Sequence, residues 1–404
     1  MSQLKSVIHS LGTTALDGAT YTYDNAGNRL TRTDKRIGTT LTYGYDNIYQ
    51  LKTAMQGTTT KESYTYDLVG NRLSSLNVSP YNYNSSNELT STPSGSYTYD
   101  ANGNTLSDPS GKSYTWDFEN RLIQAVVPGT NGGTTTFKYD PFGRRIQKSG
   151  PLGTTNYLYD GKSLGSNVIE ETDVSGNVLA RYSQFPSLDQ PLAELRSGVT
   201  SYYEQDAIGS VSALTNAAGA LANTYTYDSF GKLTASTGAV ANPFQYTGRD
   251  YDSEDSISYY RARYYDSATG RFLSEDPIRF AGGINFYAYA LDNPVNKNDP
   301  EGKNPFDHWP LNGNLWPGFR KQDGVCSTGP FANDMNSRPC VLKCCQEHDN
   351  CYTAHNCNWS SFLAQFVGMP LSFGGPCQVC NYQVIACLST ADKSRGGGGC
   401  KCSQ

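Results

Sequence analysis

The stretch Tyr21-Thr22-Tyr23-Asp24-Asn25-Ala26-Gly27-Asn28-Arg29-Leu30 holds the pattern that decides the fold of most of this chain. Its first three residues alternate with period two, which is typical of a half-buried β-strand. The next five, Asp-Asn-Ala-Gly-Asn, supply side chains that favour turns and tolerate positive φ. A returning strand is expected to start at Arg29, so the stretch predicts one β-hairpin.

The same pattern, Tyr-x-Tyr-Asp followed by a polar turn and then Arg/Lys-Leu, repeats along the chain before Gly302. Close copies are Tyr64–Leu73 and Tyr225–Leu233, and looser copies start at Tyr43, Tyr81, Tyr97, Tyr114, Phe137 and Tyr157. A single hairpin is unstable alone, so we expect the copies to stack into a continuous antiparallel sheet. We expect the tyrosines to pack this sheet. Binding of carbohydrate by exposed aromatic rings is the alternative.

These copies resemble the tyrosine–aspartate (YD) repeats of the Rhs family over residues 18–302. The resemblance is most specific near its end, in Tyr259–Asp266, Gly270–Pro277 and Asp299-Pro300-Glu301-Gly302. It implies a β-repeat region over residues 1–240 and an Rhs core-associated segment over residues 241–302. In the family this segment closes a β-shell and precedes a variable C-terminal toxin.

The resemblance also implies that the chain can cut itself near residue 302, just after Asp-Pro-x-Gly, with paired aspartates as acid and base. Asp276 is the first candidate and Asp266 the second; the alternative is that both only cap turns. Lys303 stands where families that cleave usually have leucine. About 300 residues of repeat form only part of a closed shell, so the chain is a fragment, a truncated relative or a protein that pairs with another shell protein.

Length and charge bound the possibilities further. A chain of 404 residues predicts two or more structural units. The formal net charge of -5 argues against a nucleic-acid binder, which would show a basic face. No apolar run is long enough to span a membrane, and Met1–Leu16 lacks the apolar core of an ordinary signal peptide.

All eleven cysteines lie between Cys326 and Cys402. Such a dense group predicts a disulfide domain that matures in an oxidising compartment, and the odd count leaves at least one thiol unpaired or paired between molecules. Residues 303–320 are rich in Pro, Asn, Gly and Trp and are interpreted as a linker. The cysteine-rich domain is therefore expected over residues 321–404.

Two pairs of cysteines in this domain are each seven residues apart, which on a helix is two turns and returns to nearly the same face. Two antiparallel helices can then be cross-linked twice, and the expected bridges are Cys344 with Cys387 and Cys351 with Cys380. His348 would lie between the two bridges. Cys345 points to another side, and its expected partner is Cys326.

The segment Cys344–Tyr352, with its pattern Cys-Cys-x-x-His-Asp-x-Cys-Tyr, resembles the active-site helix of secreted phospholipase A2. Residues Cys380–Cys387 resemble the second long helix of that family. The resemblance implies a small, disulfide-rich, mainly α-helical domain. A zinc site at the cysteine–histidine cluster is the alternative.

The resemblance implies a calcium-dependent mechanism. Asp349 would bind Ca2+ together with loop carbonyls, for which the candidates are Val325, Ser327 and Gly329. The ion would polarise the sn-2 ester while His348 takes a proton from the attacking water. Asn381 stands where the family has an aspartate that orients the histidine, so it can accept a hydrogen bond but adds no charge. Tyr352 would brace this second-helix residue.

These expectations combine into a polymorphic toxin that is secreted or injected and hydrolyses membrane phospholipids, with the β-repeat region as its carrier or shell. Its expected partners are a phospholipid membrane surface, an immunity protein and a secretion apparatus, and no nucleic acid. The alternative is a non-enzymatic cell-surface or adhesive protein whose tail is an inactive lipid- or protein-binding module.

Overall fold

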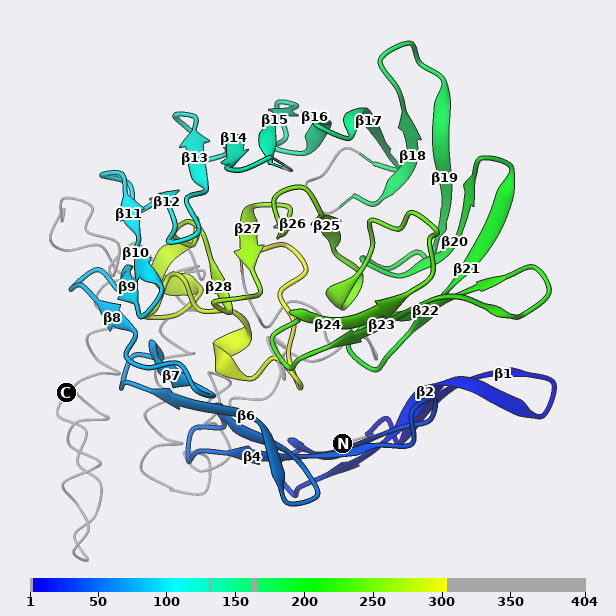
Figure 1. Cartoon of the computed structure of the whole chain (residues 1–404), viewed down its shortest axis with the longest axis horizontal. Coiled ribbons are helices and arrows are strands. Elements are labelled where there is room, and N and C mark those ends of the chain that lie inside the picture. Colours follow the sequence, from blue (N-terminus) through cyan, green and yellow to red (C-terminus); the bar gives the residue numbers. More distant parts are fainter. Residues whose placement is uncertain (1–2, 131, 162–165, 304–404) are drawn as a thin grey trace, which may run out of the picture. The chain divides into compact units, whose positions relative to one another are not determined.

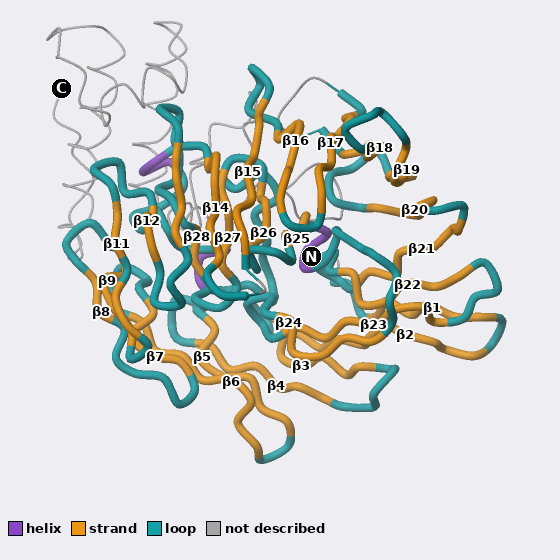
Figure 2. The backbone as a smooth tube through the Cα atoms, turned by 45° about the horizontal axis from the view of Figure 1, so that its top comes forward, coloured by secondary structure: helices purple, strands orange, loops and turns teal. Residues whose placement is uncertain are grey.

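A computed structural model describes residues 3–130, 132–161 and 166–303 of the protein, all within one compact unit, Met1–Pro310. This part of the chain consists of antiparallel strands and tight turns with three short 3-10 helices. The expected antiparallel β-fold is thus confirmed (Figures 1 and 2). The α-helical domain expected over residues 321–404 lies outside the described residues. Among the residues described, no helix is long and apolar enough to cross a membrane.

The first sheet has seven strands in the order of the sequence. They are β1 (Ser6–Leu11), β2 (Thr14–Tyr23), β3 (Arg29–Asp34), β4 (Thr40–Tyr45), β5 (Leu51–Gln56), β6 (Thr59–Tyr66) and β7 (Arg72–Ser75). A three-stranded sheet follows. It contains β8 (Asn82–Tyr83), β9 (Leu89–Thr92) and β10 (Gly95–Ser96).

The longest sheet has fourteen strands, again paired in chain order. Its first half is β11 (Thr98–Tyr99), β12 (Thr105–Ser107), β13 (Ser113–Trp116), β14 (Leu122–Val127), β15 (Gly133–Tyr139), β16 (Arg145–Gly150) and β17 (Gly153–Tyr159). Its second half is β18 (Val168–Thr172), β19 (Val178–Gln184), β20 (Pro191–Arg196), β21 (Val199–Gln205), β22 (Val211–Asn216), β23 (Leu221–Tyr227) and β24 (Leu233–Thr237).

The remaining described residues form a small sheet that lies inside the curve of β1–β24 (Figure 1). Its strands are β25 (Asp250–Asp252), β26 (Ile257–Tyr260), β27 (Arg263–Asp266) and β28 (Arg271–Phe272). Three 3-10 helices flank it, namely η1 (Tyr246–Gly248), η2 (Arg279–Ala281) and η3 (Ala290–Asp292). We call residues 241–303 the inner segment.

The hairpin turns are built by the aspartate of the repeat, and asparagine takes its place at Asn84 and Asn216. The Asp24 carboxylate accepts the backbone N–H of Asn28 at 2.8 Å and its side-chain amide at 2.9 Å. Gly27 has a φ of 92°, which a side chain would make costly. The same double bond from an asparagine four residues later recurs at Asp67, Asp100 and Asp173.

The two tyrosines of a repeat have different tasks. The first is buried in the sheet, as at Tyr21, Tyr43, Tyr64, Tyr81, Tyr114, Phe137, Tyr157 and Tyr225. The second donates its hydroxyl to a main-chain carbonyl of the preceding hairpin, at distances of 2.6–3.1 Å. This holds for Tyr23, Tyr45, Tyr66, Tyr83, Tyr99, Tyr139, Tyr159 and Tyr227. The packing role predicted for the tyrosines is therefore confirmed, and consecutive hairpins are tied side chain to backbone.

Two further copies were missed because glutamine replaces the second tyrosine. Tyr182 and Tyr203 are buried like the other first tyrosines. Gln184 donates its amide to the Val168 carbonyl at 2.9 Å, and Gln205 donates to that of Asp189 at 3.1 Å. The amide therefore replaces the phenol as the donor to the preceding hairpin.

The first hairpins contact strands that come much later in the chain. Asp17 accepts a hydrogen bond from the Ser212 hydroxyl, and Arg36 donates to the Ser212 carbonyl at 3.1 Å. His9 of β1 pairs with Glu204 of β21 at 2.6 Å. The first hairpins of the repeat region therefore touch β21 and β22.

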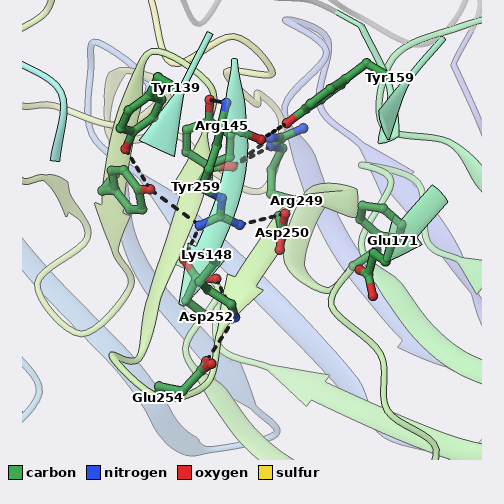
Figure 3. A network of polar contacts seen from close by, with 12 residues as sticks. Tyr139, Arg145, Lys148, Tyr159, Glu171, Arg249, Asp250, Asp252, Glu254 and Tyr259 are labelled. Carbon is green, nitrogen blue, oxygen red and sulfur yellow. Dashed lines mark hydrogen bonds and ion pairs between the residues drawn. The ribbon is translucent and has the colours of Figure 1, made fainter. Parts of the chain in front are cut away.

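A buried network joins the inner segment to the surrounding strands (Figure 3). Arg145 of β16 is fully buried and pairs with Asp250 at 2.8 Å and with Asp252 at 2.5 Å. Lys148 of the same strand pairs with Asp252 at 3.0 Å and with Glu254 at 3.1 Å. Buried charges are tolerated only when paired, so this network fixes β25 against β16.

Candidate functional site

The Asp-Pro-x-Gly motif forms a tight turn at the end of the inner segment. The Asp299 carbonyl accepts the N–H of Gly302 at 3.2 Å, and its carboxylate accepts the N–H of Lys303 at 2.9 Å. Gly302 has a φ of 65°, and a Cβ there would collide with the carbonyl oxygen of Tyr260. The aspartate and the glycine of the motif are thus both required by the turn.

The turn is fastened to the loop between β26 and β27. The Ala262 N–H donates to the Glu301 carbonyl at 3.1 Å, and the Arg261 guanidinium donates to the Pro300 carbonyl. Arg261 is itself paired with buried Asp189 at 2.7 Å. These bonds hold the main chain of residues 300–303 in one position.

Arg263, the first residue of β27, is the centre of the site. Its Nε donates to the Gly302 carbonyl at 2.5 Å, and one Nη donates to the Phe286 carbonyl at 2.8 Å. The other Nη lies 3.0 Å from Asp276 Oδ2 and 3.1 Å from Asp299 Oδ2. The side chain is only 2% exposed, so one buried cation holds two carboxylates and two peptide carbonyls together.

Asp276 is buried beside this cation. Its Oδ1 accepts the N–H of Ile278 at 2.9 Å. Burial raises the pKa of Asp276 to about 6, and Arg263 opposes that rise while Asp299 adds to it. A carboxyl with this pKa can exchange a proton near neutral pH, as a general acid or base must.

Asp266, the second candidate, occupies a different environment. Its Oδ1 accepts the N–H of Ala268 at 2.9 Å and its Oδ2 accepts the hydroxyl of Thr269 at 2.8 Å. Burial raises its pKa. The structure therefore places Asp266 at the turn between β27 and β28, and the carboxylate that shares Arg263 with Asp276 is Asp299. Asp299 is the first residue of the Asp-Pro-x-Gly motif, and this motif was the sequence feature that could have identified it.

The Gly302–Lys303 peptide bond is held at both ends. Its carbonyl oxygen faces Arg263 and its nitrogen faces the carboxylate of Asp299. The next carbonyl, that of Lys303, and Asp276 Oδ2 both border the same glycine, Gly282. A cation at a peptide oxygen stabilises negative charge that develops there, and a nearby carboxyl can move a proton. The arrangement is suited to peptide hydrolysis.

The other candidate residues lie outside the described residues, so their geometry is not tested. They are His348, Asp349, Tyr352 and Asn381, the proposed calcium ligands Val325, Ser327 and Gly329, and the cysteines Cys326, Cys344, Cys345, Cys351, Cys380 and Cys387. Within residues 3–303 as described, no group of three or more His, Cys, Asp or Glu side chains is arranged to hold a metal ion. The Ca2+ expectation stays a prediction.

Comparisons with known proteins give the following matches. The Teneurin YD-shell family model matches residues 1–295. A tRNA3(Ser)-specific nuclease WapA of Bacillus spizizenii is 36% identical over 336 residues, which cover 80% of this chain and 12% of the nuclease. A double-stranded DNA deaminase toxin A of Burkholderia cenocepacia is 29% identical over 316 residues, which cover 70% of this chain and 22% of the toxin.

Among solved structures, the crystal structure of TcdB2-TccC3-TEV is 17% identical and covers 75% of this chain and 19% of the other, with a TM-score of 0.48. The chain spans less than a quarter of the length of each of these relatives.

The relatives contradict the expected phospholipase A2 activity. They are named as a nuclease and a deaminase, which also contradicts a membrane substrate and the exclusion of nucleic acid as a partner. The charge argument used the net charge of the whole chain, whereas nucleic-acid recognition depends on local patches, so it could not exclude such a partner. The resemblance around His348 was a short motif with its supporting aspartate replaced by Asn381, and a short motif without its structural context is weak.

The repeated hairpins and the inner segment together agree with the family match. The family model matches 295 of the 404 residues, which include almost the whole described region. The resemblance to YD repeats is therefore confirmed, and the chain belongs to the Teneurin YD-shell family, within which it resembles Rhs toxins.

Proposed function

We propose that residues 3–303 are the shell of a toxin and that this shell cuts its own chain beside Lys303. The observation that carries the proposal is the Arg263 guanidinium, which gathers Asp276, Asp299 and the Gly302 carbonyl in one buried cluster. The cut would separate the shell from the residues that follow. Two bonds are in reach, the one after Gly302 and the one after Lys303.

For the bond after Gly302, the residues divide the work as follows. Asp276 takes a proton from a water molecule, whose oxygen adds to the Gly302 carbonyl carbon. Arg263 donates to the oxygen that becomes negative. Asp276 then returns the proton to the leaving nitrogen of Lys303, the C–N bond breaks, and one water is consumed. The Asp299 carboxylate accepts the N–H of Lys303 and so orients that nitrogen.

For the bond after Lys303, the supporting contact is different. The Lys303 carbonyl and Asp276 Oδ2 border the same glycine, so Asp276 is close enough to activate water at this carbonyl as well. The two alternatives give upstream fragments that differ by one lysine. Intact mass measurement therefore distinguishes them.

The test is a time course of the full chain made by cell-free synthesis and followed by intact mass. We expect fragments divided after Gly302 or after Lys303, and an uncut Asp276→Asn protein. The matched control is Asp266→Asn, which should be cut like the wild type because Asp266 caps a turn. A single intact 44.1 kDa species, or a cut that survives Asp276→Asn, would overturn the proposal.

We also propose nucleic acid as the target of the toxin, which would be secreted or injected with its shell. Support comes from the two relatives named for action on tRNA and on double-stranded DNA. The test incubates the full chain with tRNA and with duplex DNA, followed by gels for strand breaks and sequencing for base changes. Breaks or base changes are expected. Unaltered tRNA and DNA in the presence of a chain that has cut itself would contradict this target.

A further inference from the structure

The loop after Asp276 folds back over the candidate site. It contains η2, and the Gly282 N–H donates to the Arg279 carbonyl at 2.9 Å. Phe280 packs edge-on against Phe286 with ring centroids 4.9 Å apart. The loop is therefore folded by its own contacts, and it brings Gly282 next to the carboxylate.

Gly282 lies beside both the Asp276 carboxylate and the Lys303 carbonyl. A Cβ on this residue would collide with Asp276 Oδ2. It would also lie 3.0 Å from Asp276 Cγ and 3.0 Å from the carbonyl oxygen of Lys303. A carbon atom at this point is too close to both partners, so one of them would have to move.

The backbone at Gly282 does not itself require glycine. Its φ of -87° and ψ of -9° are right-handed helical values that any residue adopts. Gly302 differs, since its positive φ favours glycine whatever the surrounding space. What residue 282 must provide is therefore room between Asp276 and Lys303.

We propose that Gly282 is a positioning residue for self-cleavage, because its missing side chain lets the main chain of Lys303 lie against the Asp276 carboxylate. This inference rests on the proposed cut beside Lys303. It adds a steric requirement on a residue that itself carries no acid, base or charge. It also assigns the loop of residues 278–284 a place in the site.

The test is Gly282→Ala in the full chain, with the time course of cleavage followed by intact mass. We expect at least a ten-fold slower cut. The matched control is Ala281→Ser, which adds one atom at the adjoining exposed position and should be cut at the wild-type rate. The melting temperature is compared with that of uncut Asp276→Asn, so that both proteins are intact chains.

A second readout separates positioning from a general loss of structure. If the added methyl group displaces Asp276 from Arg263, the carboxyl loses the cation that lowers its pKa. The residual cleavage of Gly282→Ala should then rise with pH at a higher midpoint than that of the wild type. A loss of cleavage with an unchanged melting temperature, or a residual cut with the raised midpoint, supports the proposal.

Two results would overturn it. One is a Gly282→Ala chain that cuts at the wild-type rate, which leaves the proposed cleavage itself intact. The other is a Gly282→Ala chain that melts well below uncut Asp276→Asn, because the lost cut would then reflect lost structure. A wild-type chain that is not cut at all would instead contradict the proposed function.

Discussion

Arg263 shows how much of the site depends on a single side chain. Its planar guanidinium reaches two carboxylates and two peptide carbonyls, which the point charge of lysine would not do. Burial raises the Asp276 pKa to about 6 although Arg263 lowers it, and the second acid, Asp299, adds to the rise. At the residue scale, the proposed cut depends on proton transfer by Asp276 and on charge stabilisation by Arg263.

Lys303 was the departure from the family pattern, and its charge acts on the Asp276 carboxyl. Its side chain lies near the surface, 3.8 Å from Glu301, and its positive charge lowers the pKa of Asp276. A leucine at this position would remove that charge. The departure is thus expected to tune the cut.

We predict that Lys303→Leu shifts the pH dependence of self-cleavage to higher pH. A general base works only when ionised, so the wild-type rate should rise as pH increases through about 6. Loss of the Lys303 charge raises the Asp276 pKa further, and the midpoint should move up with it. The control is Lys303→Arg, which keeps the charge and should keep the midpoint. Equal midpoints for all three proteins would count against this role.

At the scale of elements, the repeat combines a turn, a buried ring and a tether. The turn is local, since the aspartate bonds a residue four positions later. The tether is longer, as when Tyr227 of β23 donates to the Val211 carbonyl of β22 at 3.0 Å. The turn could be predicted from the sequence, whereas the tyrosine hydrogen bond to the preceding hairpin became evident only in the packed sheet.

We predict that Tyr227→Phe destabilises the shell by about 1–2 kcal/mol, because the Val211 carbonyl loses a donor in a partly buried place. The measurement is the urea midpoint of the β-signal in circular dichroism. Tyr202 lies on β21, two strands away in the same sheet, and is exposed, so Tyr202→Phe is the matched control and should change little. If both variants unfold at the wild-type midpoint, the tether contributes no measurable stability.

At the scale of the whole molecule, many charges are enclosed. Burial raises the pKa of four carboxyls to about 7 in each case, namely Glu194, Asp228, Asp255 and Asp292. The folded shell therefore binds protons more tightly at these groups than the unfolded chain, whose carboxyls titrate near 4. Their contribution to stability is fully present below about pH 4 and is lost as pH rises through about 7.

We predict that the shell is more stable at pH 5.5 than at pH 8. His9 acts in the same direction, since its contacts with Glu204 and the Gln205 carbonyl raise its pKa against the effect of burial. Asp292 is buried near Arg72 and Arg271 and accepts the Gln50 amide at 3.0 Å. Asp292→Asn stays neutral, so the difference in urea midpoint between the two pH values should become smaller. A larger midpoint at pH 8 in the wild type would refute the prediction.

The amino-acid sequence by itself determined the hairpins and their turns, because these form between residues a few positions apart. Tyr-x-Tyr-Asp alternation and the glycine of each turn were sufficient for that. The copies with glutamine in place of the second tyrosine were not recognised in the sequence. Only the folded structure shows that their amides donate to the preceding hairpin. The resemblance at the end of the inner segment also singled out Asp276, which the structure places in the buried cluster with Arg263; its role in self-cleavage stays a prediction.

Tertiary structure alone decided which residues meet there. Arg263 lies 39 positions before Gly302 and 36 before Asp299, and only the fastening of the turn to β26 and β27 brings them together. Contacts such as Asp17 with Ser212 join residues 195 positions apart. No local pattern encodes such pairs, because they depend on the curvature that many stacked hairpins accumulate. The role proposed for Gly282 also depends on tertiary structure, because the space between Asp276 and Lys303 exists only in the folded protein.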